Sequence, residues 1–501
     1  IGRGDWDWHP SRVIPAGPGN EITEFPFFTL LFSDLHAHML AMPLILLIIA
    51  WAVAFIKSHA KMSRAEWIAA FAIGGLMIGA LKPTNTWDLY TFFPFLALAV
   101  IYAINRHFEW ENWFKLPNWL GRALFSIAFV VGLYLLGSLM YSPFDRWYGQ
   151  AYNSVDPWTA SRTPLSSYFT HWGLFLFIIA FWLFWEVREW MAATPVSHLK
   201  RLAPYQLGIE LGLAAVLALF IYLLMDGVQV ALIALPLAVI AGLLLLRPHM
   251  PGVKRGVLLM IGTGLALTLA VEVIALRGDI GRMNTIFKLY LQVWMLFAVS
   301  TGAAFGWLLD EFPFWNPRWR TIYQIGLYLL LAGAFMYTVT ATTDKISDRF
   351  RDTAPRTLDG MTFMNYSKHF EGQEILLKHD YRAIRWMQDN VKGSPVIVEA
   401  NCTEYRWCTR FTVYTGLPGV VGWNWHQRQQ RALLANATVF NRVSEIGMFY
   451  ITPDIDVTLA FLKKYQVKYI IVGELERAIY PPLNPMVDGL AKFQKYEGKY
   501  W

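Results

Sequence analysis

Long apolar runs separated by short polar loops dominate the first two thirds of the chain. A helix that crosses the hydrocarbon core of a bilayer needs about 20 mostly apolar residues. The pattern predicts about ten such helices, near residues 37–57, 66–81, 88–105, 121–140, 169–186, 207–225, 229–246, 256–276, 287–309 and 322–341. We therefore expect an α-helical integral membrane protein.

The pattern changes near Asp344, where charged residues become frequent and apolar runs shorten. Residues 380–391 and 456–465 predict amphipathic helices, whereas 395–400 and 467–473 predict short buried strands. Helices that alternate with short apolar strands are typical of α/β domains. The sequence therefore predicts a polytopic transmembrane domain over residues 1–343 and a C-terminal soluble α/β domain over residues 344–501.

Composition supports the membrane interpretation. Hydrophobic residues make up 55% of the 501 residues and charged residues 16%, with a mean hydropathy of +0.35. A soluble domain has about 25% charged residues. The 23 Trp residues suit two membrane–water interfaces. Basic loops beside a membrane explain the net charge of +7, so we expect membrane lipids and no nucleic acid as partners.

Lys and Arg in the loops set the expected orientation, because short cytoplasmic loops carry an excess of them. One face holds fourteen: Lys57, Lys61, Arg64, Arg106, Lys115, Arg122, Arg188, Lys200, Arg201, Arg247, Lys254, Arg255, Arg318 and Arg320. The other holds eight outside the C-terminal domain: Arg3, Arg12, Lys82, Arg146, Arg162, Arg277, Arg282 and Lys288. We expect a multi-pass protein of the cell (plasma) membrane whose C-terminal domain is extracytoplasmic. A disulfide between Cys402 and Cys408 could persist there, and the sequence leaves that pairing open.

Polar and aromatic clusters gather in the extracytoplasmic loops, where the chain enters the membrane. Ionisable groups near the hydrocarbon are costly and mark candidate functional sites. Asp34 and Glu24 are candidate catalytic carboxylates that would deprotonate an acceptor hydroxyl. Asp34 with His38 is also a candidate site for a divalent cation, Mg²⁺ or Mn²⁺. The alternative makes Asp34 a helix N-cap. We expect the site to include His36, His38, Asp88, Asp279 and Asn284.

Arg282 and Lys288 lie where the helix near 287–309 meets the outer interface. Arg grips a phosphate bidentately and Lys acts as a point charge, so the pair suits a lipid phosphate or pyrophosphate, with Lys82 as a third candidate. In the alternative interpretation these side chains snorkel to lipid headgroups. Glu272, near the outer end of its helix, would simply pair with Arg277 or Arg282.

The C-terminal domain carries a basic, aromatic set of residues that includes Arg410, Trp423, His426 and Arg431. Such a surface stacks on a sugar or holds an anionic group. It equally suits packing against the membrane domain, and both interpretations stay open.

Four ordered motifs resemble the multi-pass "YYY" membrane-protein family of bacteria and archaea. They are EFPFFTLLFSDLHAHMLAMP, RMNTIFKLYLQ, YTGLPGVVGWNWHQRQQR and VKYIIVGELERAIY. Ala37 departs from the expected DLHPH pattern. The family usually has further helices upstream, and we expect that the sequence begins inside a longer natural protein. The family itself implies no settled activity.

The architecture also resembles the GT-C glycosyltransferases, which take a sugar from a polyprenyl-phosphate carrier. This resemblance implies a membrane glycosyltransferase that uses a lipid-linked sugar as donor and an extracytoplasmic acceptor. Two alternatives stay open: a noncatalytic scaffold or assembly subunit of an envelope or energy-transducing complex, and a transporter of a lipid or glycan. Charges buried at mid-membrane would favour transport, and the sequence shows almost none.

Overall fold

The computed structural model describes residues 6–16, 20–57, 62–107, 117–149, 154–350, 353–481 and 490. Among the cations that set the expected orientation, Arg3, Lys61 and Lys115 lie outside these ranges. The chain forms two compact units. The first contains residues 1–143 and 152–349, and the second contains residues 144–151 and 350–501. The division falls after Arg349 because the last long helix continues past Asp344.

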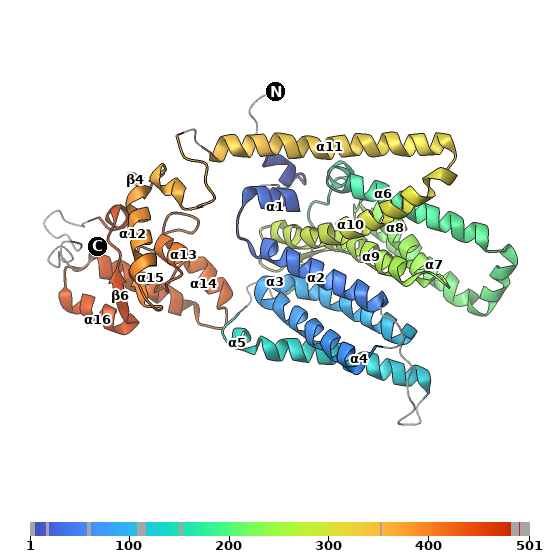
Figure 1. Ribbon diagram of the computed structural model, residues 1–501, viewed down its shortest axis with the longest axis horizontal. Coiled ribbons are helices and arrows are strands. Elements are labelled where there is room, and N and C mark those ends of the chain that lie inside the picture. The colour runs from blue at the N-terminus through green and yellow to red at the C-terminus, as the bar shows by residue number, and fades with distance from the viewer. Residues whose placement is uncertain are drawn as a thin grey trace. The chain divides into compact units, whose positions relative to one another are not determined.

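The first unit, which we call the membrane unit, is a helical bundle (Figure 1). Its elements are η1 His9–Ser11, α1 Pro26–Phe32, α2 Ala37–Lys57, α3 Arg64–His107, α4 Asn118–Met140, α6 Leu165–Ala193, η2 Val196–Tyr205, α7 Gln206–Met225, α8 Ala231–Leu246, α9 Gly252–Val273, α10 Met283–Glu311, η3 Phe312–Phe314 and α11 Pro317–Arg349. The short helix α5 Ser142–Asp145 follows α4.

Each of the ten expected segments corresponds to one of these helices, although 229–246 begins two residues before α8 and 256–276 ends three residues after α9, in β2. Eight helices in the described ranges are long and apolar enough to cross a membrane, and α8 is a shorter apolar helix. The 44-residue α3 contains two expected segments, because it is broken at Asn85, whose backbone is not helical (φ −153°, ψ 97°). The chain is therefore a helical integral membrane protein, as the sequence predicts.

The two arms of α3 run in opposite directions. Along the first arm, the contacts with α4 advance from Phe125, beside Trp67, to Gly137, beside Gly79. Along the second arm they go back from Tyr134, beside Phe93, to Arg122, which donates to the Asn105 carbonyl oxygen. Gly79 and Gly137 allow the first arm to approach α4 closely, since a Cβ on Gly79 would lie 2.6 Å from the Gly137 carbonyl oxygen. Small residues at such crossings are typical of membrane helix pairs.

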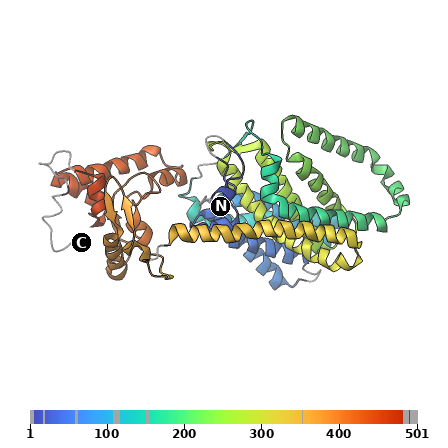
Figure 2. The same ribbon diagram turned by 90° about the horizontal axis from the view of Figure 1, so that it is seen from above.

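The bundle has two different ends. We call the "motif end" the one where α2 and α10 begin, α9 ends and α3 is broken. We call the "basic end" the one where α2 ends and α9 begins. At the motif end, β1 Val155–Pro157 pairs antiparallel with β2 Ile274–Leu276, which joins the loops before α6 and after α9. At the edge of the bundle, α7 and η2 protrude (Figure 2), and α7 is mostly exposed.

The second unit, which we call the C-terminal unit, has its own hydrophobic core. Its elements are η4 Thr362–Asn365, β3 Lys368–Phe370, β4 Glu374–Leu376, α12 Leu377–Asn390, β5 Val396–Val398, α13 Arg410–Thr415, α14 Asn424–Gln430, α15 Asn436–Ile451, α16 Ile455–Tyr465, β6 Val467–Ile470 and α17 Glu474–Ile479. The four segments predicted as helices and strands correspond to α12, α16, β5 and β6.

The strands of the C-terminal unit form two small sheets in the described ranges. β3 and β4 pair antiparallel, and β5 and β6 pair parallel. The Tyr450 hydroxyl donates toward the Val398 and Ile471 carbonyl oxygens, at 3.2 and 2.8 Å. These contacts hold α15 against the parallel strands β5 and β6. A disulfide joins Cys402 and Cys408.

Candidate functional site

The most accessible acid–base pair at the motif end is Asp34 with His36. The short helix α1 ends at Ser33, which adopts a left-handed conformation (φ 59°) and turns the chain toward α2. His36 Nδ1 lies 2.5 Å from Asp34 Oδ2, and both side chains are about half exposed. A carboxylate on one ring nitrogen fixes the tautomer of the histidine and orients its other nitrogen. The pair can therefore accept a proton from a group that approaches from outside.

Behind this pair lies a second, less accessible carboxylate. Glu24 Oε1 accepts a hydrogen bond of 3.1 Å from Arg12 Nη2, and its side chain is 14% exposed. Burial raises the pKa of Glu24 despite the opposing effect of Arg12. His38 Nε2 lies 3.8 Å from Glu24 Oε2 and 3.4 Å from the Thr29 hydroxyl. Glu24 is thus mainly engaged with Arg12, and Asp34 is the more available base.

Lys288 on α10 is a cation at the same end of the bundle. Its side chain is partly buried. It interacts electrostatically with Asp88, Asp279 and His38. Within the described ranges, no carboxylate oxygen lies within 4 Å of its ammonium and no hydrogen bond engages it. We call Asp34, His36, His38, Glu24 and Lys288 the Asp34 site.

Asp88 lies three residues after the break in α3 and interacts electrostatically with Lys288. It is 1% exposed and accepts hydrogen bonds of 2.9 Å from Gln292 Nε2 and 3.1 Å from Asn85 Nδ2. Gln292 also accepts a bond from the Thr91 hydroxyl. Lys288 and Gln292 are four apart on α10 and so share a helix face. Sequence reasoning missed Gln292, although this spacing could have indicated it.

Arg282 has a different environment from the one expected. It is 1% exposed. Its Nη1 donates to the Val271 carbonyl oxygen at 2.8 Å and to Glu272 Oε1 at 2.9 Å, and its Nη2 donates to the Thr163 hydroxyl at 3.0 Å. Its Nε lies 3.4 Å from Glu21 Oε1. A phosphate on Arg282, as the sequence led us to expect, would have to replace these contacts, because protein groups already surround the guanidinium.

We call Arg282, Glu272, Glu21 and Thr163 the Arg282 cluster. Glu272 also accepts hydrogen bonds from the Thr163 backbone N–H and hydroxyl. One guanidinium thus faces two buried carboxylates. Burial, partly offset by Arg282, raises the pKa of Glu21 to about 7. Glu272 pairs with Arg282, one of its two expected partners, whereas Arg277 pairs with Asp156 at 2.8 Å.

Asp279 and Asn284 belong to the start of α10. The Asp279 carboxylate accepts bonds of 3.1 and 2.8 Å from the backbone N–H groups of Asn284 and Thr285. It also accepts bonds from the Asn284 side-chain amide and the Thr285 hydroxyl. These contacts occupy amide donors that a helix start leaves without partners. Both residues therefore hold the loop that positions Lys288.

The expected group of residues does meet at one end of the bundle. Glu24, Asp34, Asp88, Asp279, Arg282 and Lys288 all lie in the membrane unit, but their contacts form separate groups. Lys288 interacts with Asp88, Asp279 and His38, and His38 lies beside Glu24. Asp34 contacts His36, and Arg282 contacts Glu272 and Glu21. Lys82 lies in the first arm of α3, three positions before Asn85, and is partly buried. In the described ranges no three His, Cys, Asp or Glu side chains are arranged to hold a metal ion. Asp34 and His38 instead face His36 and Glu24, respectively.

Of the C-terminal residues, Arg410 is buried, Trp423 and His426 are partly buried, and Arg431 is exposed. Arg410 is 2% exposed, so its expected place on a surface is wrong. Its guanidinium donates to Asp380 at 2.7 Å and to Glu476 at 2.9 Å, and Glu399 lies 3.8 Å away. Burial lowers the pKa of Arg410, but Glu476 and Asp380 outweigh burial and raise it.

The other three residues lie near one another. His426 Nε2 is 2.9 Å from the Tyr405 hydroxyl, and its ring centroid is 5.4 Å from that of Trp423. Arg431 is exposed and donates to the Gln427 side chain at 3.1 Å. An aromatic, basic surface therefore exists at this place without Arg410.

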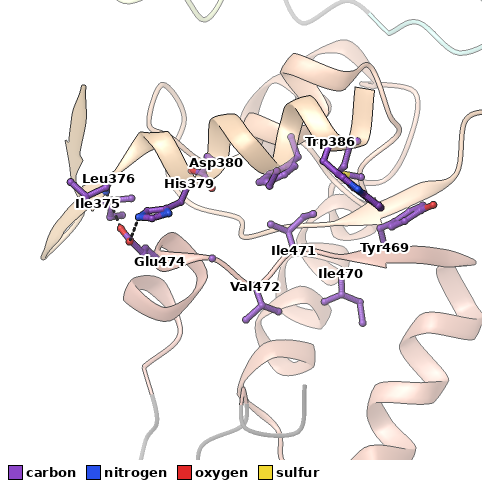
Figure 3. A pocket seen from close by; sticks show the side chains of 14 residues that line it. Ile375, Leu376, His379, Asp380, Trp386, Tyr469, Ile470, Ile471, Val472 and Glu474 are labelled. Carbon is purple, nitrogen blue, oxygen red and sulfur yellow. Dashed lines mark hydrogen bonds and ion pairs between the residues drawn. The ribbon is translucent and has the colours of Figure 1, made fainter. Parts of the chain in front are cut away.

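A separate cavity of about 210 Å³ lies between α12 and the segment that contains β6. His379 and Glu474 lie at one end, and Trp386 and Tyr469 lie at the other (Figure 3). The side chains between these ends are mainly aliphatic. His379 Nε2 is 3.7 Å from Glu474 Oε1. Sequence reasoning did not single out this cavity.

Comparison with known proteins places the chain in a family without assigning a reaction. Residues 1–297, more than half of the chain, match the model of the family described as "Uncharacterized membrane protein (DUF2298)". No curated protein and no solved structure matches the chain. With its apolar helices and this match, the chain belongs to that family of membrane proteins.

Proposed function

We propose that the protein is a GT-C-like glycosyltransferase that moves a sugar from a polyprenyl-phosphate carrier to an acceptor hydroxyl at the motif end. The observation that carries the proposal is the exposed Asp34–His36 pair, with its 2.5 Å contact. General base catalysis needs such a pair within reach of the hydroxyl that loses its proton. The partly buried Lys288 supplies a positive charge nearby.

The reaction assigns a role to each group. The acceptor oxygen attacks the anomeric carbon, and the bond from this carbon to the phosphate oxygen breaks. The polyprenyl phosphate leaves with the electron pair, and the acceptor proton passes to Asp34, directly or through His36. Lys288 stabilises the charge that develops on the leaving phosphate. Membrane lipids and the carrier are the partners of this reaction, and the acceptor is extracytoplasmic.

Two observations support placing the motif end and the C-terminal unit outside the cytoplasm, in the cell membrane. Loops at the basic end carry more Lys and Arg than loops at the motif end. The Cys402–Cys408 disulfide suits an oxidising compartment. We further propose that the C-terminal unit is a soluble domain that contributes the Trp423, His426 and Arg431 surface to sugar recognition.

The test is sugar transfer by the full chain in nanodiscs, from a panel of polyprenyl-phosphate sugars, with Mg²⁺ or with EDTA. Asp34→Asn should lower the rate roughly 10²–10³-fold, because it removes a base that acts in the transition state. Asp156→Asn is the matched control, since Asp156 is an exposed carboxylate paired with Arg277 at the same end. It should keep the wild-type rate.

The proposal fails if Asp34→Asn and Asp156→Asn transfer sugar equally well. If the wild-type chain transfers no sugar from any donor but retains a partner during purification, the scaffold alternative is favoured. The transporter alternative is tested with the full chain in sealed liposomes. Movement of an intact lipid-linked glycan across the liposome bilayer, without sugar transfer to an acceptor, would favour it.

A further inference from the structure

The basic end of the bundle contains a cavity that the proposed reaction does not use. It has a volume of about 620 Å³. The ends of α2 and of the second arm of α3, the loop before α9 and the start of α9 surround it. Its lining residues are Ile56, Lys57, Tyr102, Arg106, His249, Met250, Pro251, Gly252, Val253 and Arg255.

The Arg255 side chain lines the cavity and is held in place by several contacts. Its guanidinium donates to the Met250 carbonyl oxygen at 3.2 Å and to the Arg247 carbonyl oxygen at 2.8 Å. Its Cζ also lies 5.4 Å from the ring centroid of Tyr102. These contacts tie the loop before α9 to the second arm of α3. Gly252 lies close to the end of α2, since a Cβ there would lie 3.2 Å from Ile56 Cγ2.

The charge of the cavity has one sign. Lys57, Arg106 and Arg255 contribute positive charges, and no Asp or Glu is among the described residues that line it. Lys57 and Arg106 are exposed. The first backbone N–H groups of α9 add partial positive charge, because a helix start leaves them without acceptors in the helix. An anionic group is therefore the complementary ligand.

An apolar groove begins where this cavity ends. It has a volume of about 650 Å³ and is lined by Val299 of α10 together with Leu46, Ile49, Ala50, Val53, Ala54 and Lys57 of α2. The α2 positions recur every three or four residues, so they form one face of the helix. From Leu46 to Lys57 this face runs roughly 16 Å along the helix axis. Lys57 lines both the groove and the cavity.

We propose that the cavity and the groove together bind one anionic phospholipid from the leaflet at the basic end. The phosphate occupies the cavity beside Lys57, Arg106 and the start of α9. An acyl chain follows the apolar face of α2 away from that end. Basic pockets between membrane helices recognise anionic headgroups in this way, and the adjoining apolar groove selects a lipid rather than a free phosphate.

The test follows the thermal unfolding midpoint of the detergent-solubilised full chain during titration. Phosphatidylglycerol should raise the midpoint in a saturable manner. Phosphatidylcholine tests the acyl chain alone, and inorganic phosphate tests the anion alone; neither should reproduce the rise. Lys57→Gln/Arg106→Gln should weaken the apparent affinity for phosphatidylglycerol roughly 30-fold, at about 1 kcal/mol per cation.

Two further variants separate headgroup, groove and general charge effects. Arg188→Gln/Arg318→Gln removes two exposed cations at the same end, outside the cavity, and should leave the affinity unchanged. Ala54→Trp fills the exposed groove and should weaken phosphatidylglycerol binding while both cations remain. Equal effects of the two double variants would overturn the site. Equal responses to phosphatidylglycerol and phosphatidylcholine, or full reproduction by inorganic phosphate, would overturn it as well.

Discussion

Arg282 and Lys288 are six positions apart in one motif at the same end of the bundle, yet their surroundings differ. Arg282 is 1% exposed and donates to three protein oxygens at 2.8–3.0 Å. Lys288 has no such bond in the described ranges and lies in the field of Asp88 and Asp279. The comparison separates a cation that holds the fold from one that is available to a ligand.

The C-terminal unit repeats the first arrangement. Arg410 lies among Asp380, Glu399 and Glu476 just as Arg282 lies between Glu21 and Glu272. In both places several carboxylates surround one guanidinium. Arg410 donates to Asp380 and Glu476, whereas Arg282 donates to Glu272 and lies 3.4 Å from Glu21. Buried arginines in this protein therefore join distant segments, and its candidate chemistry belongs to the partly exposed groups of the Asp34 site.

The largest expected effect comes from breaking the Arg282 cluster. Arg282→Met should lower the free energy of unfolding by about 3–5 kcal/mol, because it leaves two buried carboxylates without their cation. The measurement is thermal unfolding in nanodiscs, with the yield of folded protein. Arg277→Gln is the matched control: Arg277 is 64% exposed, and its loss should change little. Equal unfolding midpoints for the two variants would contradict the claim that the buried Arg282 stabilises the fold more than the exposed Arg277 does.

A smaller effect should depend on pH. Burial raises the pKa of Glu21 to about 7, above its value in the unfolded chain, so the folded state retains a proton that the unfolded state releases. This contribution is fully present below about pH 4.5 and is lost as the pH rises through 7. The wild type should lose up to about 3 kcal/mol relative to Glu21→Gln over this range.

Thermal unfolding of both proteins between pH 4.5 and 7.5 checks this prediction. The difference between the two midpoints should grow as the pH rises. A constant difference would mean that Glu21 is already ionised in the folded state at low pH, and Arg282 would then satisfy both carboxylates.

The sequence predicts the helices well because each is a continuous apolar run. It separates residues 66–81 from 88–105 at the polar stretch that contains Asn85, where the structure breaks α3. The strands Val396–Val398 and Val467–Ile470 are predicted for the same reason, since short β-branched runs stand out between charged helices.

The roles of the cations are harder to predict, because their partners are distant in the sequence. Arg282 meets Thr163 and Glu21, and Arg410 meets Glu476; no local pattern links these positions. The sequence around a cation at the membrane interface does not show whether its side chain is buried among protein groups or exposed to a ligand. Asp34 and His36 form a local contact, two positions apart. The sequence indicated Asp34 as a candidate base but did not predict its contact with His36.

The most direct test of this account is the equilibrium binding of a radiolabelled short-chain polyprenyl phosphate to the full chain in nanodiscs. Lys288→Gln should weaken binding about tenfold, because a charge-assisted contact with the phosphate is lost, and its unfolding midpoint should stay near that of the wild type. Arg282→Lys should lower the unfolding midpoint but keep the wild-type affinity per folded molecule. Loss of binding in Arg282→Lys together with unchanged binding in Lys288→Gln would contradict the account.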